Sequence, residues 1–182
     1  MGGRFQKNGL PPGLLRRIAV YGACLLLLSV AQCSFFARLR FLPATPDLIL
    51  GFAVAVTLLD SRKSGIAVAI AGGFWIDALG GVGVSLSPIL YVAVAVLVSF
   101  PAQKMLPRFF SWLILMLPAT LCDALYGALR LWLRMGAYPI REALLEILLP
   151  MIGCTLLFCA PLYGAVRLCL PLLQDPRERS LR

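Results

Sequence analysis

The sequence predicts an all-α integral membrane protein, built as a bundle of six transmembrane helices. Of its 182 residues, 60% are hydrophobic and 14% are charged, whereas an average soluble domain has about 45–50% apolar and about 25% charged residues. A soluble globule of this size could not bury so much apolar surface, so lipid is the expected solvent. The apolar residues also fall into six runs separated by short polar or glycine-rich stretches, which predicts the number of helices.

Composition also excludes several kinds of chemistry. The chain has no histidine, which excludes Ser-His hydrolysis and His-bound metal sites. Its six cysteines all lie in apolar segments and form no Cys-x-x-Cys motif, so we expect them to be packing residues and expect no metal and no cofactor. The net charge is +9. Because the basic residues flank apolar runs, membrane lipids and not nucleic acid are the predicted partner.

The expected organisation is one membrane domain between two cytoplasmic tails. Residues 1–17 are polar and basic and form the N-terminal tail, residues 18–170 form the six-helix transmembrane domain, and residues 171–182 form the C-terminal tail. The six expected spans are Ile18–Phe36, Pro46–Leu59, Ser64–Leu79, Leu86–Phe100, Phe109–Leu133 and Leu144–Leu170.

Each span is predicted from the length of its apolar run and from the Gly, Pro and charged residues at its boundaries. Ile18–Phe36 is long enough to cross a hydrocarbon core of about 30 Å. Because of this length, and because many spans follow, we do not expect it to be a cleaved signal peptide. The next two spans are short and could instead form a re-entrant hairpin. A hairpin would place the charged turn 60–63 at mid-membrane depth, at a cost of about 2.5–3.5 kcal/mol per charge. Two short helices that reach water at this turn are therefore expected. The glycine-rich stretch Gly80-Gly81-Val82-Gly83 predicts a loop. Proline suits the first turn of a helix at Pro88 and predicts a kink at Pro118. Pro150 and Pro161 are expected to interrupt the last span.

The distribution of Lys and Arg predicts the orientation. With six spans, both termini lie on one side, and that side carries 12 basic residues against 5 on the other. The excess marks the cytoplasmic side, so both termini are predicted to be cytoplasmic. Four aromatic residues near the predicted span ends are expected to lie at the lipid–water interface: Trp75, Tyr91, Trp112 and Trp132.

A stripe of small residues marks the third span. Gly65, Ala69, Gly73 and Asp77 recur every fourth residue and therefore share one face of a helix. Small side chains on such a face let another helix approach closely in lipid. Asp77 at the end of the stripe has two interpretations: a polar site at the close contact, or a structural carboxylate that binds the backbone of the 80–83 turn.

Three more polar residues lie in or beside apolar spans. Asp47 follows Thr45 and Pro46 at the start of the second span, where Thr45 can cap, proline suits the first turn and an acid favours the helix N-terminus. Asp123 lies inside the fifth span, and Arg130 is about 10 Å further along the same helix, too far for a direct pair. Asp123 therefore needs a partner on another helix, a water-filled pocket or a proton.

Gln32 in the first span is a candidate partner for Asp123, although a glutamine in a span more often joins two helices through an ordinary hydrogen bond. The predicted topology places Asp47, Asp77 and Asp123 in the outer half of the membrane. We therefore expect an outward-facing charged cluster where the second, third and fifth spans open.

Ordered motifs between residues 32 and 91 make the chain resemble the bacterial rod shape-determining protein MreD family. The matching stretches are Gln32-Cys33-Ser34, Thr45-Pro46-Asp47-Leu48-Ile49-Leu50, the basic turn Arg62-Lys63 with Gly65, Gly73-Phe74-Trp75-Ile76-Asp77, and Gly81-Val82-Gly83-Val84-Ser85. The match covers about a third of the chain, and only hydropathy supports it after residue 91. Ala69 departs from the family, which often has glycine there.

The resemblance implies a role in the bacterial inner membrane. It implies a non-catalytic subunit of the cell-elongation machinery that acts with MreC, indirectly with MreB, and with the glycosyltransferase and transpeptidase of peptidoglycan synthesis. It also implies a fold like that of the substrate-binding components of energy-coupling-factor transporters. On this basis Pro46, Asp47, Gly73 and Asp77 would shape the bundle or a partner-binding groove, and no residue inherits a catalytic role.

Two other functions fit the same sequence. A transporter subunit would use the acidic cluster to bind a small vitamin-like molecule and would associate with a cytoplasmic ATPase. An intramembrane aspartyl protease would pair Asp77 with Asp123 to activate water, although neither acid lies in a Gly-x-Gly-Asp motif.

Overall fold

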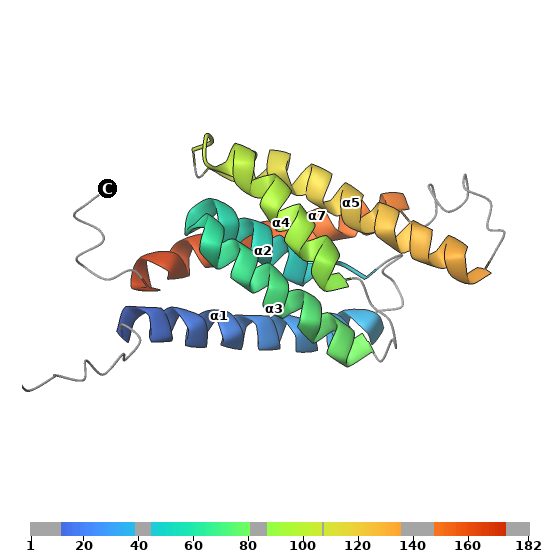
Figure 1. The fold of residues 1–182 in the computed structure, drawn as a ribbon, viewed down its shortest axis with the longest axis horizontal. Helices are drawn as coiled ribbons and strands as arrows, with labels where there is room; N and C mark the ends of the chain where they lie inside the picture. The colour runs from blue at the N-terminus through green and yellow to red at the C-terminus, as the bar shows by residue number, and fades with distance from the viewer. Residues whose placement is uncertain (1–11, 39–44, 81–86, 107, 136–147, 174–182) are drawn as a thin grey trace, which may run out of the picture.

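The computed structural model describes residues 12–38, 45–80, 87–106, 108–135 and 148–173, and all structural statements concern these residues. They form six α-helices (Figure 1). A π-helical turn and a 3-10 turn follow the first helix and extend it. The elements are α1 (Pro12–Val30), η1 (Ala31–Phe35), η2 (Phe36–Arg38), α2 (Leu48–Leu59), α3 (Arg62–Gly80), α4 (Ser87–Ala102), α5 (Phe109–Met135) and α7 (Leu149–Leu173). The predicted all-α fold with six helices is confirmed for the described part of the chain.

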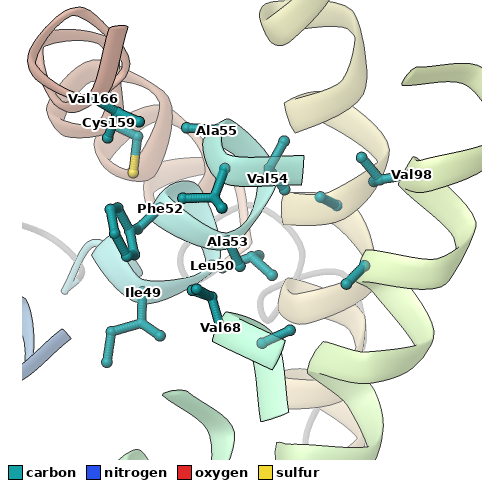
Figure 2. Packing of buried hydrophobic residues seen from close by; sticks show 14 of the residues in the cluster. Ile49, Leu50, Phe52, Ala53, Val54, Ala55, Val68, Val98, Cys159 and Val166 are labelled. Atoms are coloured by element: carbon teal, nitrogen blue, oxygen red, sulfur yellow. The ribbon is translucent and has the colours of Figure 1, made fainter. Parts of the chain in front are cut away.

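The shortest helix, α2, lies at the centre and contacts each of the other five α-helices. Its sequence is apolar on every face, as a helix surrounded on all sides must be, and all but one of its residues are buried. Figure 2 shows α2 side chains such as Ile49 and Phe52 packed against residues of neighbouring helices, including Val68, Val98 and Cys159. Twelve residues give α2 a length of about 18 Å, so its ends lie within the bundle and not beyond it.

Three helices are long and apolar enough to cross a membrane: α1, α5 and α7, through the segments Arg16–Phe35, Phe109–Leu129 and Leu149–Leu170. Their outer faces carry large hydrophobic side chains that are 70–77% exposed: Leu27, Phe110, Leu157 and Leu168. Apolar surface on this scale is typical of a face covered by lipid or by a partner. Length and exposure together indicate a multi-pass membrane protein. The other apolar helices, α2 and α4, are shorter.

The helices run alternately up and down. Contacts of Arg17 with Asp60 and of Gln32 with Leu48 place the start of α1 beside the end of α2, and the end of α1 beside the start of α2. The start of α1, the turn between α2 and α3, the turn between α4 and α5, and the end of α7 therefore lie at one end of the bundle (Figure 1). This is the end that the Lys and Arg distribution marks as cytoplasmic.

The small-residue stripe of α3 lies where two helices approach it most closely. A Cβ atom on Gly65 would lie 2.7 Å from Cα of Thr57 in α2, and one on Gly73 would lie 2.5 Å from Cα of Pro88 in α4. Ala69, between the two glycines, is fully buried. Neighbouring Gly72 instead leaves room for the side chain of Ile49 of α2. Glycine at positions 65 and 73 allows α3 to pack against α2 and α4 with backbone close to backbone.

Some expectations differ from the structure. Helix α1 begins at Pro12, before the predicted start of the first span. Helix α7 continues through Pro161 without interruption, since neighbouring helices and side chains in a bundle can compensate for the lost backbone bond. Tyr91 and Trp112 are buried in the core, so their predicted interfacial position is wrong. Trp75 and Trp132 are exposed.

Candidate functional site

Three residues singled out in the sequence, Gln32, Asp47 and Asp123, lie near the start of α2. Together with three residues that the sequence did not single out as site residues, they form a group that we call the Asp47 cluster: Gln32, Asp47, Tyr91, Asp123, Thr155 and Cys159. Asp47 is the N-cap of α2, and its Oδ1 accepts a hydrogen bond of 3.0 Å from the backbone N–H of Leu50. This is the ordinary chemistry of an N-cap aspartate. The predicted cap was Thr45, but Asp47 itself occupies the cap position and Pro46 lies just before the helix.

Side chains from two other helices satisfy the remaining backbone groups at this helix start. Gln32, in the π-helical turn after α1, accepts through Oε1 a 3.1 Å bond from the N–H of Leu48. Thr155 of α7 accepts through Oγ1 a 3.1 Å bond from the N–H of Asp47. The Cys159 thiol, also in α7, donates to the carbonyl oxygen of Asp47 at 3.4 Å. A helix start with no access to water requires such partners, because unpaired backbone groups are costly in an apolar environment.

Helix α4 contributes a further bond to this aspartate. The hydroxyl of Tyr91 donates to Oδ2 of Asp47, and Tyr91 is only 3% exposed. Asp77 and Asp123 also lie close enough to Tyr91 to interact electrostatically with its hydroxyl. The three acids expected to form one cluster therefore lie within electrostatic range of one tyrosine, and Asp47 is the one that bonds to it. They do not face outward, since Asp47 and Asp123 are buried and Asp77 is half-buried.

The buried carboxylate of Asp123, in α5, has Asp47 as its electrostatic neighbour. Of the two interpretations of Gln32, the structure shows the ordinary bond between helices, since its Oε1 accepts from the start of α2. The side chain of Arg130 lies outside those described. The acid that the structure brings close to Asp123 is thus Asp47, which already serves as a helix cap.

The other predicted site residues have different positions. Gly65 and Gly73 lie at the helix contacts described above, whereas Gly81 and Gly83 lie outside the described residues. In the described part of the chain, no group of three or more Cys, Asp or Glu is placed to hold a metal ion.

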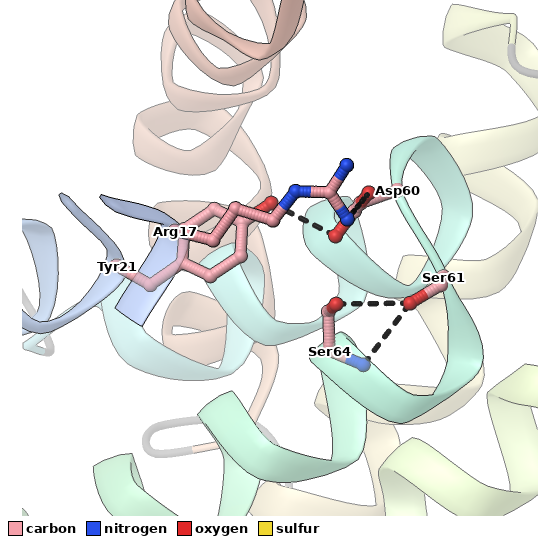
Figure 3. Close-up of polar contacts among 5 residues, drawn as sticks. All are labelled: Arg17, Tyr21, Asp60, Ser61 and Ser64. Atoms are coloured by element: carbon pink, nitrogen blue, oxygen red, sulfur yellow. Dashed lines mark hydrogen bonds and ion pairs between the residues drawn. The ribbon is translucent and has the colours of Figure 1, made fainter. Parts of the chain in front are cut away.

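A third buried acid, Asp60, closes the other end of α2 (Figure 3). Its Oδ2 accepts a 3.0 Å bond from the Tyr21 hydroxyl, and its Oδ1 lies 3.6 Å from Nη1 of Arg17. The side chain of Asp60 is 4% exposed and that of Arg17 is 20% exposed. Both partners come from α1, so this group, which we call the Asp60 cluster, joins the start of α1 to the end of α2. Arg62 and Lys63 of this turn are exposed, whereas the buried pair of Asp60 with Arg17 was not predicted from the sequence.

Both clusters use their polar atoms to join helices. Sequence reasoning missed Tyr91, Thr155, Cys159 and Tyr21 as members. A lone tyrosine in an otherwise apolar run is the signal that could have identified Tyr91, because a buried tyrosine hydroxyl usually has a hydrogen-bond partner. No comparable signal marks Thr155 or Cys159, which lie more than 100 positions from Asp47 in the chain.

Comparisons with protein-family models, with curated proteins and with solved structures find no match to this chain.

Proposed function

We propose that the chain is a non-catalytic membrane subunit of the bacterial cell-elongation machinery, with the role that its resemblance to the MreD family implies. In this role it binds MreC and the peptidoglycan synthases through helix packing, and acts on MreB indirectly. The proposal includes six transmembrane spans, both termini in the cytoplasm, and a fold like that of energy-coupling-factor substrate-binding components.

The observation that carries the proposal is that the motif residues make contacts between helices. Gln32 and Asp47 make hydrogen bonds at the start of α2, and Gly73 packs against the backbone of α4. These are the residues on which the resemblance depends. Groups that hold helices in register fit a subunit that works by contact, since both carboxylate oxygens of Asp47 already accept hydrogen bonds from within the chain.

Affinity purification of the full chain from mild detergent, in a rod-shaped bacterium, tests the proposal. We expect MreC and the wall synthases to co-purify. The Gly73→Leu variant should lose them, because its side chain would separate α3 from α4. The Gly127→Leu variant is the control, since no atom lies within 4 Å of a Cβ atom at Gly127. Recovery of a pair of ATPase subunits in place of MreC would contradict the proposal and support the transporter subunit.

Replacement of the acids separates the proposal from an intramembrane protease. Asp77→Asn and Asp123→Asn preserve the shape of each side chain but remove the carboxylate. A packing role predicts that both variants retain co-purification and restore rod shape to cells depleted of their own MreD. Cleavage of a membrane peptide that is abolished by either change would contradict the proposal.

A further inference from the structure

A groove runs between α1 and α3. Its volume is about 410 Å³, and its small-residue wall comes from Gly22, Ala67 and Ala71. One wall of the groove extends from Arg17 to Leu25 of α1, and the facing wall extends from Lys63 to Ala71 of α3. Eight helical steps correspond to a length of about 12 Å.

The two ends of the groove differ in chemistry. Arg17, Lys63 and Ser64 lie at one end, and apolar residues line the rest. Arg17 is paired with Asp60, whereas Lys63 is exposed and forms no ion pair with any described residue. The Ser64 hydroxyl accepts a 2.9 Å bond from Ser61, so its own proton is available to a ligand (Figure 3).

A second groove serves as an internal comparison. It lies between α1 and α7, with Phe52 of α2 also in its lining, and has a volume of about 180 Å³. Apolar residues and Tyr21 line it, and none of its lining residues is basic. The cationic end is therefore specific to the α1–α3 groove. It lies at the end of the bundle that the basic residues mark as cytoplasmic.

We infer that the α1–α3 groove binds one anionic phospholipid of the cytoplasmic leaflet. Lys63 and the Ser64 hydroxyl contact its phosphate, and one acyl chain lies along the apolar wall. Basic pockets between transmembrane helices on the cytoplasmic side bind such headgroups. A purely apolar partner helix fits less well, because it would offer no anion to the exposed Lys63 at the cytoplasmic end of the groove.

Native mass spectrometry of the purified full chain tests this inference. The chain is titrated with phosphatidylglycerol and with phosphatidylcholine of the same acyl chains. We expect one tightly bound phosphatidylglycerol, and we expect Lys63→Gln to reduce the preference for it about fivefold. Lys104→Gln is the matched control, since Lys104 is also exposed, lies in the turn after α4 at the same end of the bundle, and is not part of the groove.

A second pair of variants tests the acyl-chain wall. Ala67→Leu fills the α1–α3 groove and should reduce binding of both lipids, whereas Ala165→Leu fills the other groove and should leave binding unchanged. All four sites are exposed, so each variant is expected to fold, with elution and thermal unfolding without added lipid as the check. Equal lipid preference in Lys63→Gln and Lys104→Gln would overturn the inference. So would stabilisation by inorganic phosphate alone, or a cross-link from Ala67→Cys to another protein.

Discussion

The hydroxyl of Tyr91 in α4 donates a hydrogen bond to Oδ2 of Asp47, the N-cap of α2. Another tyrosine, Tyr163 in α7, is buried to the same extent, at 3% exposure, yet its hydroxyl has no hydrogen-bond partner among the described residues. The two tyrosines therefore form a matched pair for measuring what the bond to Asp47 contributes.

Removal of one hydroxyl should be costly and removal of the other should not. Tyr91→Phe leaves one oxygen of Asp47 without its donor and should reduce the free energy of unfolding by about 1 kcal/mol. Tyr163→Phe removes a hydroxyl that is buried and unpaired, so it should leave stability unchanged or raise it. Unfolding in detergent checks both variants. Equal losses would show that the bond to Asp47 contributes nothing specific.

Truncation of the cap itself should have a larger effect. Asp47→Ala leaves both Leu50 N–H and the Tyr91 hydroxyl without an acceptor, so we expect a loss of about 2 kcal/mol in the same measurement. Asp47→Asn keeps a side-chain oxygen that can cap and should lose less than half as much. If alanine and asparagine are equivalent, the cap geometry is not what stabilises the start of α2.

Glycine 73 is expected to be intolerant of even one added methyl group. In Gly73→Ala the new Cβ would lie 2.5 Å from Cα and 2.9 Å from N of Pro88. These are backbone atoms that cannot rotate away, so α3 and α4 must separate, at a loss of about 1–3 kcal/mol. Gly127→Ala, in open surroundings within α5, should instead gain about 0.5–1 kcal/mol from higher helix propensity. Thermal unfolding of the two variants compares them directly.

The ion pair at the other end of α2 gives a further test. Arg17→Gln removes the cation beside the buried carboxylate of Asp60 and leaves the hydrogen bond from the Tyr21 hydroxyl in place. We expect a loss of about 2 kcal/mol, below the ~3–5 kcal/mol of a fully buried pair because Arg17 is partly exposed. Arg62→Gln, which removes an exposed cation–π contact with Phe100 at 4.9 Å, should lose about 0.5 kcal/mol.

A double-mutant cycle isolates the Arg17 interaction. Asp60→Asn combined with Arg17→Gln should lose less than the sum of the two single variants, since the acid that needed a partner is gone. Additive losses would mean that Arg17 and Asp60 stabilise the protein independently of one another.

The proposed orientation can be tested by labelling two exposed positions at opposite ends of the bundle. In a background without the native exposed thiols of Cys33 and Cys169, Thr45→Cys lies before α2 and Lys104→Cys lies after α4. A membrane-impermeant maleimide should label Thr45→Cys on intact spheroplasts, and Lys104→Cys only after permeabilisation. The reverse pattern would place both termini outside.

Sequence reasoning located the helices better than it located their polar partners. The ranges of α2, α3, α4 and α5 follow from apolar runs and from their Gly, Pro and charged boundaries, which are local signals. The stripe Gly65, Ala69, Gly73 also follows from local spacing, although spacing alone did not reveal that Gly65 faces α2 while Gly73 faces α4.

The partners of the acids could not be read in the same way. Asp47 was correctly interpreted as part of a helix start, but its bonds to Tyr91 and Thr155 depend on how α4 and α7 pack. Asp60 was treated as a solvated turn residue because it precedes Arg62 and Lys63 in the chain. The cation that pairs with it is Arg17, in a different helix, and periodicity within one segment carries no information about such contacts.

The enclosure of α2 has a consequence for biogenesis. The N–H of Asp47 bonds to Thr155, which is synthesised 108 residues later, so the ribosome must produce most of the chain before this helix start is complete. Until then α2, at about 18 Å, is shorter than a hydrocarbon core of about 30 Å, and its Asp47 end still lacks the partners that α4 and α7 supply. A nascent chain stalled before α7 is therefore expected to be a substrate for membrane quality-control proteases.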